Sequence, residues 1–167
     1  MRIRDSLLSD FNREAGQTRG VLEAVPEDRL DWKPHDKSMS LGVLAGHVAE
    51  SPGWTQGMME ADLDFAAASD WTPFVPQNRT ELLEFFEKTT SGFRSLIADL
   101  ENEFLLQEWC MRDGDKVHMR MPRHEAMRTI AIHHTLHHRG QLTVYLRLLE
   151  VPVPPTYGPT ADFPDKF

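Results

Sequence analysis

Three histidines in this sequence have a type and a spacing that suit metal binding. His134 and His138 lie four residues apart in a long helical pattern near the C-terminus, and His47 lies in an earlier one. Residues four apart on a helix project from the same face about one turn apart, so their imidazoles can share one ion. Neutral imidazole is a good ligand for Zn, Ni, Cu, Fe or Mn. The spacing therefore predicts a three-histidine metal site.

The same histidines also have a simpler interpretation. A single inward histidine is usually a hydrogen-bonded core residue, and pairs four apart arise by chance in a run such as His-His-Thr-Leu-His-His. A helical projection of residues 123–149 places His134 and His138 near the middle of the apolar stripe. It places His133 and His137 nearer the edge, so we expect one inward pair and one more exposed pair. A helical interaction module without a metal is the alternative.

Three neutral ligands would leave a divalent ion its full charge and open coordination positions. That arrangement is typical of catalytic rather than closed structural sites. Such an ion lowers the pKa of a bound thiol or water, and we take thiol activation as the leading mechanism. Thr135, not Glu, follows His134, so the sequence lacks the His-Glu-x-x-His pattern of metalloproteases. Peptide hydrolysis is therefore disfavoured.

Polar side chains near these histidines are candidates for supporting the ligands. Gln141 lies one turn beyond His138 and is suited to orient a bound water or ligand, with an amide that bonds only to backbone as the alternative. Glu50 and Glu60 are candidate acceptors for an imidazole N–H, and a solvated surface position is the alternative for each.

Larger side chains nearby have mainly packing interpretations. Trp54 and Met58 either line the mouth of a pocket near His47 or fill the core. Tyr145 is predicted to pack. Arg139 projects away from the apolar stripe, which predicts a contact on the helix surface or with a second subunit.

Composition restricts the class of protein. The length suits one domain over residues 1–167, and the formal net charge of −8, without clustered Lys or Arg, argues against nucleic acid as a partner. We expect no membrane partner either, because no run of about 18 apolar residues offers a span and the N-terminus lacks a signal-peptide core. The single cysteine, Cys110, rules out an internal disulfide and fits a reducing compartment. We therefore expect a cytoplasmic protein.

Four segments of the chain have the apolar period of a helix, with ends marked by caps and prolines. Ser40 and either Asn78 or Thr80 are the expected caps, and Pro52-Gly53 should bend or restart the second segment. The predicted helices are 5–24, 40–67, 80–101 and 122–150. The apolar stripe of the last one comprises Met127, Ile130, Ala131, Leu142, Tyr145, Leu148 and Leu149.

Apolar and polar residues alternate between Leu106 and Met121, around Asp113-Gly114, which predicts a β-hairpin. Pro122 then fits the first turn of the last helix, and a proline-rich tail follows it. The fold class predicted from these elements is all-α. We expect an up-down four-helix bundle with a long crossover link between the second and third helices and a small hairpin before the last.

Sequence motifs in three places resemble the DinB-like (DinB/YfiT) superfamily of four-helix-bundle metalloproteins. The resemblance spans nearly the whole chain. The motifs are Ser40-Leu41-Gly42-x-Leu44-x-x-His47, His134-x-x-x-His138-Arg139-Gly140-Gln141-Leu142 and Val153-Pro154-Pro155-Thr156-Tyr157-Gly158. The resemblance implies one divalent ion, often Zn or Ni with Mn or Fe as alternatives, held by His47, His134 and His138 with water at the remaining positions.

The resemblance also implies a class of activity. The superfamily includes thiol-dependent S-transferases and isomerases that use low-molecular-weight thiols, and its members often form homodimers. We therefore expect a metal-dependent transferase or isomerase that acts on a small electrophile with a thiol cosubstrate. A metal-binding bundle without turnover, with a binding or stress-response role, and a metal-assisted hydrolase are the alternatives.

Overall fold

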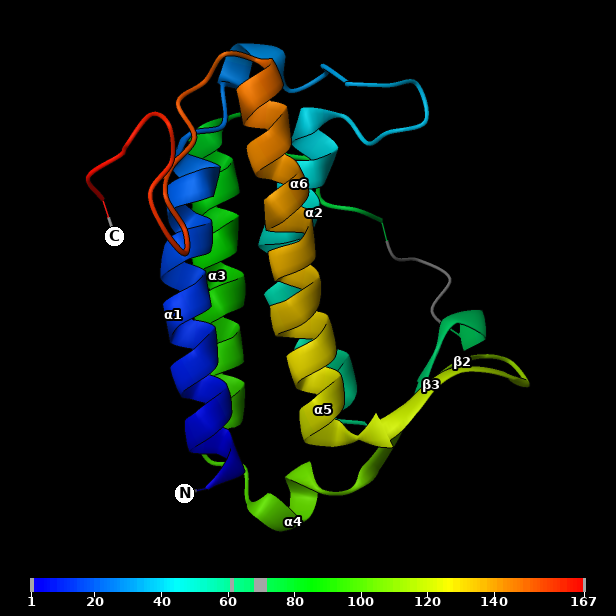
Figure 1. Cartoon of the computed structure of the whole chain (residues 1–167). Helices are drawn as coiled ribbons and strands as arrows, with labels where there is room; N and C mark the ends of the chain where they lie inside the picture. Colours follow the sequence, from blue (N-terminus) through cyan, green and yellow to red (C-terminus); the bar gives the residue numbers. More distant parts are fainter. Residues whose placement is uncertain (1, 61, 68–71, 167) are drawn as a thin grey trace.

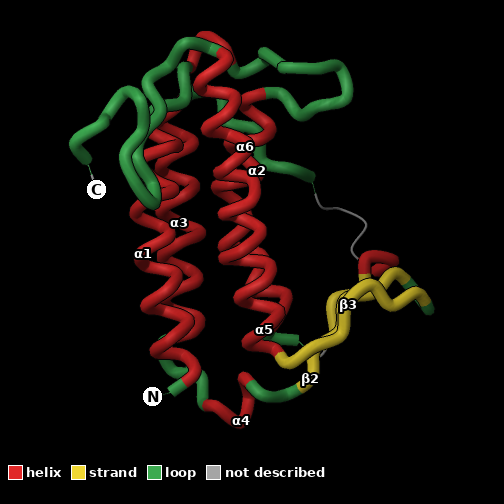
Figure 2. Tube along the Cα trace, viewed as in Figure 1, coloured by secondary structure: helices red, strands yellow, loops and turns green. Residues whose placement is uncertain are grey.

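Four long helical segments pack side by side in the computed structural model, which describes residues 2–60, 62–67 and 72–166 (Figures 1 and 2). The segments are α1 (Ile3–Glu23), α2 (Leu41–Glu50) with its 3-10 continuation η2 (Ser51–Met58), α3 (Arg79–Ile97), and a final helix made of α5 (Arg123–Met127), the π-helical η4 (Arg128–His133) and α6 (His134–Leu148). The predicted four-helix bundle is confirmed. Met1 and Phe167, the ends of the predicted domain, lie outside the described residues.

α1 and the final helix run in one direction, and α2 and α3 run in the other (Figure 1). The backbone N–H of Ile3 donates to Asn102 Oδ1 at 3.0 Å, so the start of α1 contacts the short helix α4 (Asn102–Leu105) that follows α3. Arg123 Nη1 donates to the carbonyl of Met58 at 2.9 Å, so the start of the final helix meets the end of η2. Because α2 and α3 are parallel, the link between Met58 and Arg79 joins the end of one helical segment to the start of the other at the opposite end of the bundle. This link is the predicted crossover.

Two of the predicted helix caps form as the residue types require. Ser40 Oγ accepts a hydrogen bond from the Val43 N–H at 3.3 Å at the start of α2. Asn78 Oδ1 accepts one from the Glu81 N–H at 2.8 Å at the start of α3. Each cap satisfies a backbone donor that the first turn of a helix leaves free.

The second predicted helix, 40–67, is too long because the helical segment ends at Met58, but the change expected at Pro52-Gly53 is present and begins after Glu50. The α-helix stops there and the chain continues as a tighter 3-10 helix to Met58. Pro52 has no N–H to donate to an α-helical ladder, and Thr55 Oγ1 instead donates to the Pro52 carbonyl at 2.7 Å. The chain also forms three short helical turns outside the four long segments, namely η1 (Glu27–Arg29), η3 (Phe65–Ala67) and α4 (Asn102–Leu105).

A small sheet stands beside one end of the bundle (Figure 2). Its strands are β1 (Asp62–Asp64), β2 (Glu108–Asp113) and β3 (Lys116–Pro122). β2 and β3 form the predicted antiparallel hairpin, and its turn contains Gly114 with a φ of 58°, which glycine adopts without strain. β1, which the sequence did not predict, pairs parallel with β2, with Asp62 opposite Cys110. Pro122 is the last residue of β3 rather than part of a helical turn.

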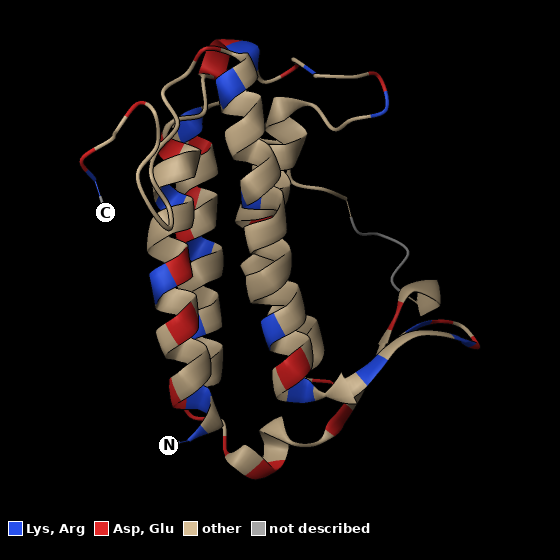
Figure 3. Ribbon diagram, in the orientation of Figure 1, with Lys and Arg blue, Asp and Glu red and all other residues tan. Residues whose placement is uncertain are grey.

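The core lies between the four helices and extends under the hairpin. Its largest fully buried side chains are Trp109, Phe93, Leu7, Leu22, Leu41, Leu44, Met58, Leu82, Ile97, Leu105, Met127 and Leu142. Leu148, predicted in the apolar stripe of the last helix, is instead 56% exposed. Acidic and basic positions are interspersed along α1 (Figure 3). None of the helices in the described part of the chain is long and apolar enough to cross a membrane.

Candidate metal centre

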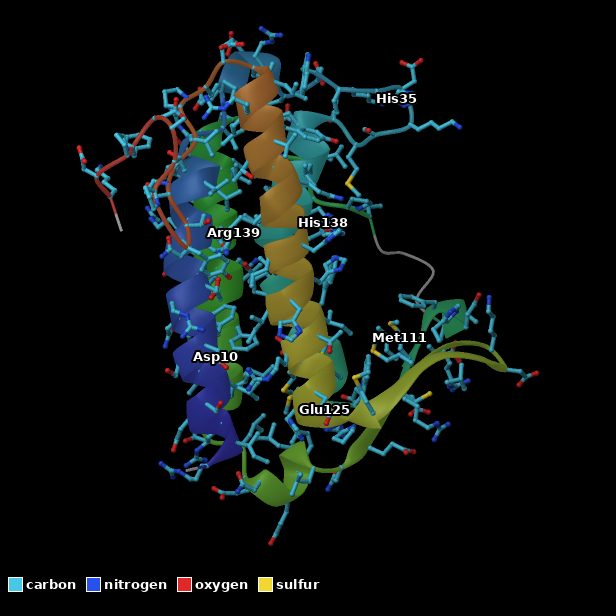
Figure 4. The ribbon with its side chains drawn as sticks, viewed as in Figure 1. Asp10, His35, Met111, Glu125, His138 and Arg139 are labelled. Carbon is cyan, nitrogen blue, oxygen red and sulfur yellow. The ribbon has the colours of Figure 1, made fainter. Side chains whose placement is uncertain are left out.

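The three predicted histidines come together on the inner sides of α2 and α6. His47 lies in the last turn of α2, His134 is the first residue of α6, and His138 follows one turn later. Figure 4 labels His138 on α6. The Nε2 atoms of His47 and His134 are 2.9 Å apart. One ring nitrogen from each of the three histidines lies within 4.8 Å of the other two. The geometry thus brings three imidazole donors to one point between two helices.

The donor set fits a divalent first-row ion. Zn–N bonds of about 2.0–2.1 Å place two nitrogens of a tetrahedral site about 3.3 Å apart. That spacing lies between the 2.9 Å from His47 Nε2 to His134 Nε2 and the 4.8 Å within which all three donors lie. The ring centroids of His134 and His138 are 4.4 Å apart, and the planes lie at 72°, so the rings do not stack in a way that would hide their nitrogens. Among the described residues, no other His, Cys, Asp or Glu joins the cluster. A bound ion would therefore keep open positions.

The surroundings keep two of these histidines neutral. Burial, reinforced by the neighbouring imidazoles of His138, His47 and His137, lowers the pKa of His134 to about 4. Burial also lowers the pKa of His138, although its hydrogen bond with Gln141 acts in the opposite direction. A metal ligand must offer a lone pair rather than a proton. At neutral pH these two side chains are therefore already in the form that binds a metal.

The π-helical segment η4 sets the direction in which the histidines point. A π-turn holds more residues than an α-turn, so it rotates α6 relative to α5 compared with one continuous α-helix. A single α-helical projection therefore misplaces the buried side of α6. That side is centred on Thr135, Leu142 and Leu146, and His134 and His138 lie at its edge rather than in its middle. At the edge, both imidazoles face His47 of α2; His134 is partly buried and His138 is 8% exposed.

The same rotation corrects the prediction for Arg139, which is 3% exposed and lies inside the bundle. Its guanidinium donates to Glu14 Oε2 at 3.0 Å and to Thr18 Oγ1 at 3.2 Å. Tyr157 of the C-terminal tail donates its hydroxyl proton to the same Glu14 oxygen at 2.6 Å. Arg139 therefore joins α6, α1 and the tail, and the prediction that it contacts solvent or a second subunit is wrong.

Glu14 is a buried carboxylate that the sequence analysis missed. It lies on the apolar side of α1, three residues after Phe11 and four before Thr18, and this position is the signal that could have identified it. Burial alone would raise the pKa of Glu14, but hydrogen bonds from Tyr157 and Arg139 outweigh it and hold the pKa below its usual value. The carboxylate is thus charged and paired.

Two predicted supporting residues contact the ligand histidines. Gln141 Oε1 lies 2.8 Å from His138 Nδ1, and Gln141 Nε2 lies 3.1 Å from the exposed His137. Glu50 is 5% exposed, and its Oε1 lies 3.4 Å from His47 Nδ1. For His47 this nitrogen faces away from the cluster, because its Nε2 is the atom that lies beside His134.

The remaining candidates lie farther from the ligand atoms or serve the core. The ring of Trp54 is 5.0 Å from that of His47 and only partly buried, which places it at the edge of the site. Met58 is a fully buried core residue. Glu60 has an exposed side chain, and Tyr145 donates its hydroxyl proton to the Met39 carbonyl at 3.3 Å.

Comparison with known sequences identifies related proteins. A model of the DinB family matches residues 2–165 of the chain. The protein YrdA of Bacillus subtilis (strain 168), described as uncharacterized, is 26% identical over 163 residues, which cover 98% of this chain and 93% of YrdA.

Solved structures share the fold at low sequence identity. A DinB-like protein from Bacillus cereus ATCC 10987 has a TM-score of 0.69 at 21% identity, over 92% of this chain and 97% of that one. YfiT from Bacillus subtilis, reported as a probable metal-dependent hydrolase with an unusual four-helix bundle topology, has a TM-score of 0.65 at 14% identity, over 88% and 87%. A mycothiol-dependent maleylpyruvate isomerase has a TM-score of 0.54 at 12% identity, over 90% and 64%.

Proposed function

The chain belongs to the DinB family, and from that premise we propose that it is a metal-dependent enzyme whose ion is held by His47, His134 and His138. One observation carries the proposal: a ring nitrogen from each histidine lies within 4.8 Å of the other two. Imidazole donors without thiolate or carboxylate partners suit Zn or Ni, with Mn or Fe as weaker alternatives.

We further propose that the reaction transfers or rearranges groups on a small electrophile with the help of a low-molecular-weight thiol. When bound, an ion with three neutral ligands lowers the pKa of a thiol at its open position. Among the described residues, no carboxylate lies within the histidine cluster to serve as a general base. A thiol does not need such a base. A thiol nucleophile therefore fits this chain better than water does.

The chain's own residues would prepare the site for that chemistry. Burial keeps His134 and His138 in their neutral forms, and Gln141 holds the ring of His138 through its Nδ1 atom. Trp54 supplies an apolar wall next to His47 and His134, with ring centroids 5.0 and 5.4 Å away. An apolar wall suits the carbon skeleton of a small electrophile.

The fold relatives support metal-dependent chemistry of this kind but do not distinguish hydrolysis from thiol-dependent reactions. One is reported as a probable metal-dependent hydrolase and another as a mycothiol-dependent isomerase, and both share only the fold with this chain. The small-molecule substrate, the thiol and a homodimeric assembly all remain predictions.

The experiment is a thiol titration of the Co(II)-substituted protein. If the ion takes a thiolate at an open position, added low-molecular-weight thiol should produce a sulfur-to-cobalt charge-transfer band. The band should be lost in His138→Ala and kept in His133→Ala, whose imidazole is exposed. A parallel assay with a chromogenic electrophile should show conjugation that a chelator abolishes.

The same titration identifies the competing function. If no thiol changes the cobalt spectrum but carboxylates or hydroxamates do, thiol transfer is wrong and metal-assisted hydrolysis becomes the better description. If neither class of ligand changes the spectrum, the ion has no open position and the enzyme proposal is wrong.

A further inference from the structure

We propose that Glu50 orients His47 and supplies the counter-charge of the metal centre, an inference that rests on the proposed function. Glu50 is the last residue of α2, three residues after His47, and its side chain is 6% exposed. Its Oε1 lies 3.4 Å from His47 Nδ1 and has no hydrogen-bond partner of good geometry among the described residues. A buried charged oxygen in this state needs an explanation, because its desolvation is costly.

No Lys or Arg in the described ranges forms an ion pair with Glu50. Its contact with His47 Nδ1 at 3.4 Å would be an ion pair only with a protonated imidazole. Glu14, the other buried glutamate, pairs with Arg139 at 3.0 Å. The contrast matters because a buried carboxylate that no positive group compensates is far more destabilising than one that is paired. A divalent ion on the far nitrogen of His47 would be that positive group. The carboxylate would then offset part of the charge of the ion, which three neutral imidazoles do not compensate.

The position of Glu50 also determines which nitrogen of His47 is free. A carboxylate beside Nδ1 favours the tautomer with the proton on Nδ1 and the lone pair on Nε2. Nε2 is the atom that lies 2.9 Å from His134 Nε2, inside the cluster. Gln141 also contacts a ligand imidazole, with its Oε1 2.8 Å from His138 Nδ1. Two ligands thus have a side-chain oxygen beside Nδ1, and only the one beside His47 belongs to a carboxyl group.

The second oxygen of Glu50 is held by the segment that returns from the crossover. The backbone N–H of Phe74 donates to Glu50 Oε2 at 3.2 Å. Phe74 can approach α2 this closely because residue 46 is glycine: a Cβ atom there would lie 2.0 Å from the Phe74 carbonyl oxygen. Phe74 also stacks on Phe85 with ring centroids 3.9 Å apart. The Phe74 N–H therefore holds one oxygen of the Glu50 carboxylate, and the other oxygen faces His47.

The test is the metal affinity of Glu50→Gln, measured by competition with a chromogenic chelator at a temperature at which the apo protein is folded. Glutamine keeps the shape but loses the charge, and its single carbonyl can serve either His47 or Phe74, not both. Loss of such a partner typically weakens metal binding by about 10- to 100-fold. Glu60→Gln is the matched control, because Glu60 is an exposed glutamate shortly after η2 and the substitution removes the same charge. The control should bind metal as tightly as the wild type.

A second measurement keeps the inference testable if the variant does not fold. Long-range ¹H–¹⁵N NMR spectra of the apo wild-type protein should show His47 protonated on Nδ1 and free on Nε2. A buried glutamate with only a structural role would lower the melting temperature of the apo variant and leave affinity unchanged within about twofold. That result, or His47 protonated on Nε2, overturns the inference. A wild-type protein that binds no metal overturns the proposed function instead, and the NMR result still decides the orientation of His47.

Discussion

The Nε2 atoms of His47 and His134 lie 2.9 Å apart, although 87 positions separate the two residues in the sequence. Two neutral imidazole nitrogens at this distance can share one proton, and a third nitrogen, from His138, lies close to both. A single ion in place of the shared proton would satisfy all three lone pairs at once.

Each ligand should be individually necessary. Replacing His47, His134 or His138 singly with Ala removes one of three donors. Losing a residue that only hydrogen-bonds to a ligand weakens metal binding by about 10- to 100-fold, and we expect the loss of a ligand itself to weaken it more. Elemental analysis of untagged protein and chelator competition measure this. His133→Ala, which removes an exposed imidazole of the same helix, should bind normally. Unchanged stoichiometry in all three variants would contradict the proposed centre.

The apo protein should lose stability as the pH falls from about 6.5 toward about 4. The folded-state pKa of His134 is about 4, below the unfolded value of 6.5, so the unfolded chain binds more protons between these values. Protonation therefore favours unfolding in this window, and the lowered pKa of His138 adds to it. Urea unfolding at several pH values measures the slope. His134→Ala should flatten it, whereas His35→Ala, at an exposed position, should not.

The buried ion pair should contribute far more than a surface pair. Breaking a buried pair costs about 3–5 kcal/mol of unfolding free energy when the remaining charge has no other partner. In Arg139→Ala, Glu14 keeps its contacts with Arg13 and Tyr157, so we expect a loss toward the lower end of that range. Arg120→Ala removes an exposed pair with Glu108, which is worth about 0–1 kcal/mol. Denaturant unfolding of both variants gives the comparison. Equal losses would show that Arg139 does not act through burial.

The lowered pKa of Glu14 adds a separate acid sensitivity. Its stabilising contribution is present above the unfolded value of 4.5 and is lost as the pH falls through the lower folded value. We expect Glu14→Gln to be less stable than the wild type at pH 7 and to approach it in acid. The pH dependence of the unfolding midpoint measures this, and a constant difference between pH 7 and pH 3 would contradict it.

Gly46 should not tolerate even a methyl group. A Cβ atom there would meet the Phe74 carbonyl oxygen at 2.0 Å, so Gly46→Ala must move the returning segment. We expect net destabilisation despite the gain of up to about 1 kcal/mol in helix propensity. Gly16→Ala, in α1 with nothing within 4 Å of its added Cβ, should instead stabilise the protein by about 0.5–1 kcal/mol. Thermal unfolding compares the two, and a more stable Gly46→Ala variant would show that the close approach is not required.

Local sequence signals predicted the elements that depend on local chemistry. The caps at Ser40 and Asn78 and the glycine turn at Gly114 follow from side chains and backbone angles within a few residues. The three-residue β1 has no such signal, because its pairing with β2 is made across the fold. The crossover itself was predicted from the length of the link, but its return path was not.

The π-helical segment explains why one part of the site was misplaced. No residue type in 128–133 signals a wider turn, so a regular projection placed Arg139 outside and Leu148 inside. The histidine pair survived the error because both residues lie after the segment and keep their spacing of four. The predicted contrast between an inward and an exposed pair is confirmed, since His138 is buried and His134 partly buried whereas His133 and His137 are exposed. His134 and His138 nevertheless lie at the edge of the buried side of α6 rather than in its middle.

The central claim is that one ion is bound by three histidines from two helices, and a crystal structure of the metal-loaded protein with anomalous diffraction at the metal edge tests it most directly. We predict one strong anomalous peak about 2.0–2.1 Å from a nitrogen of each of His47, His134 and His138, with solvent at the open position. A peak held by the exposed His133 and His137 with none in the cluster would contradict the claim.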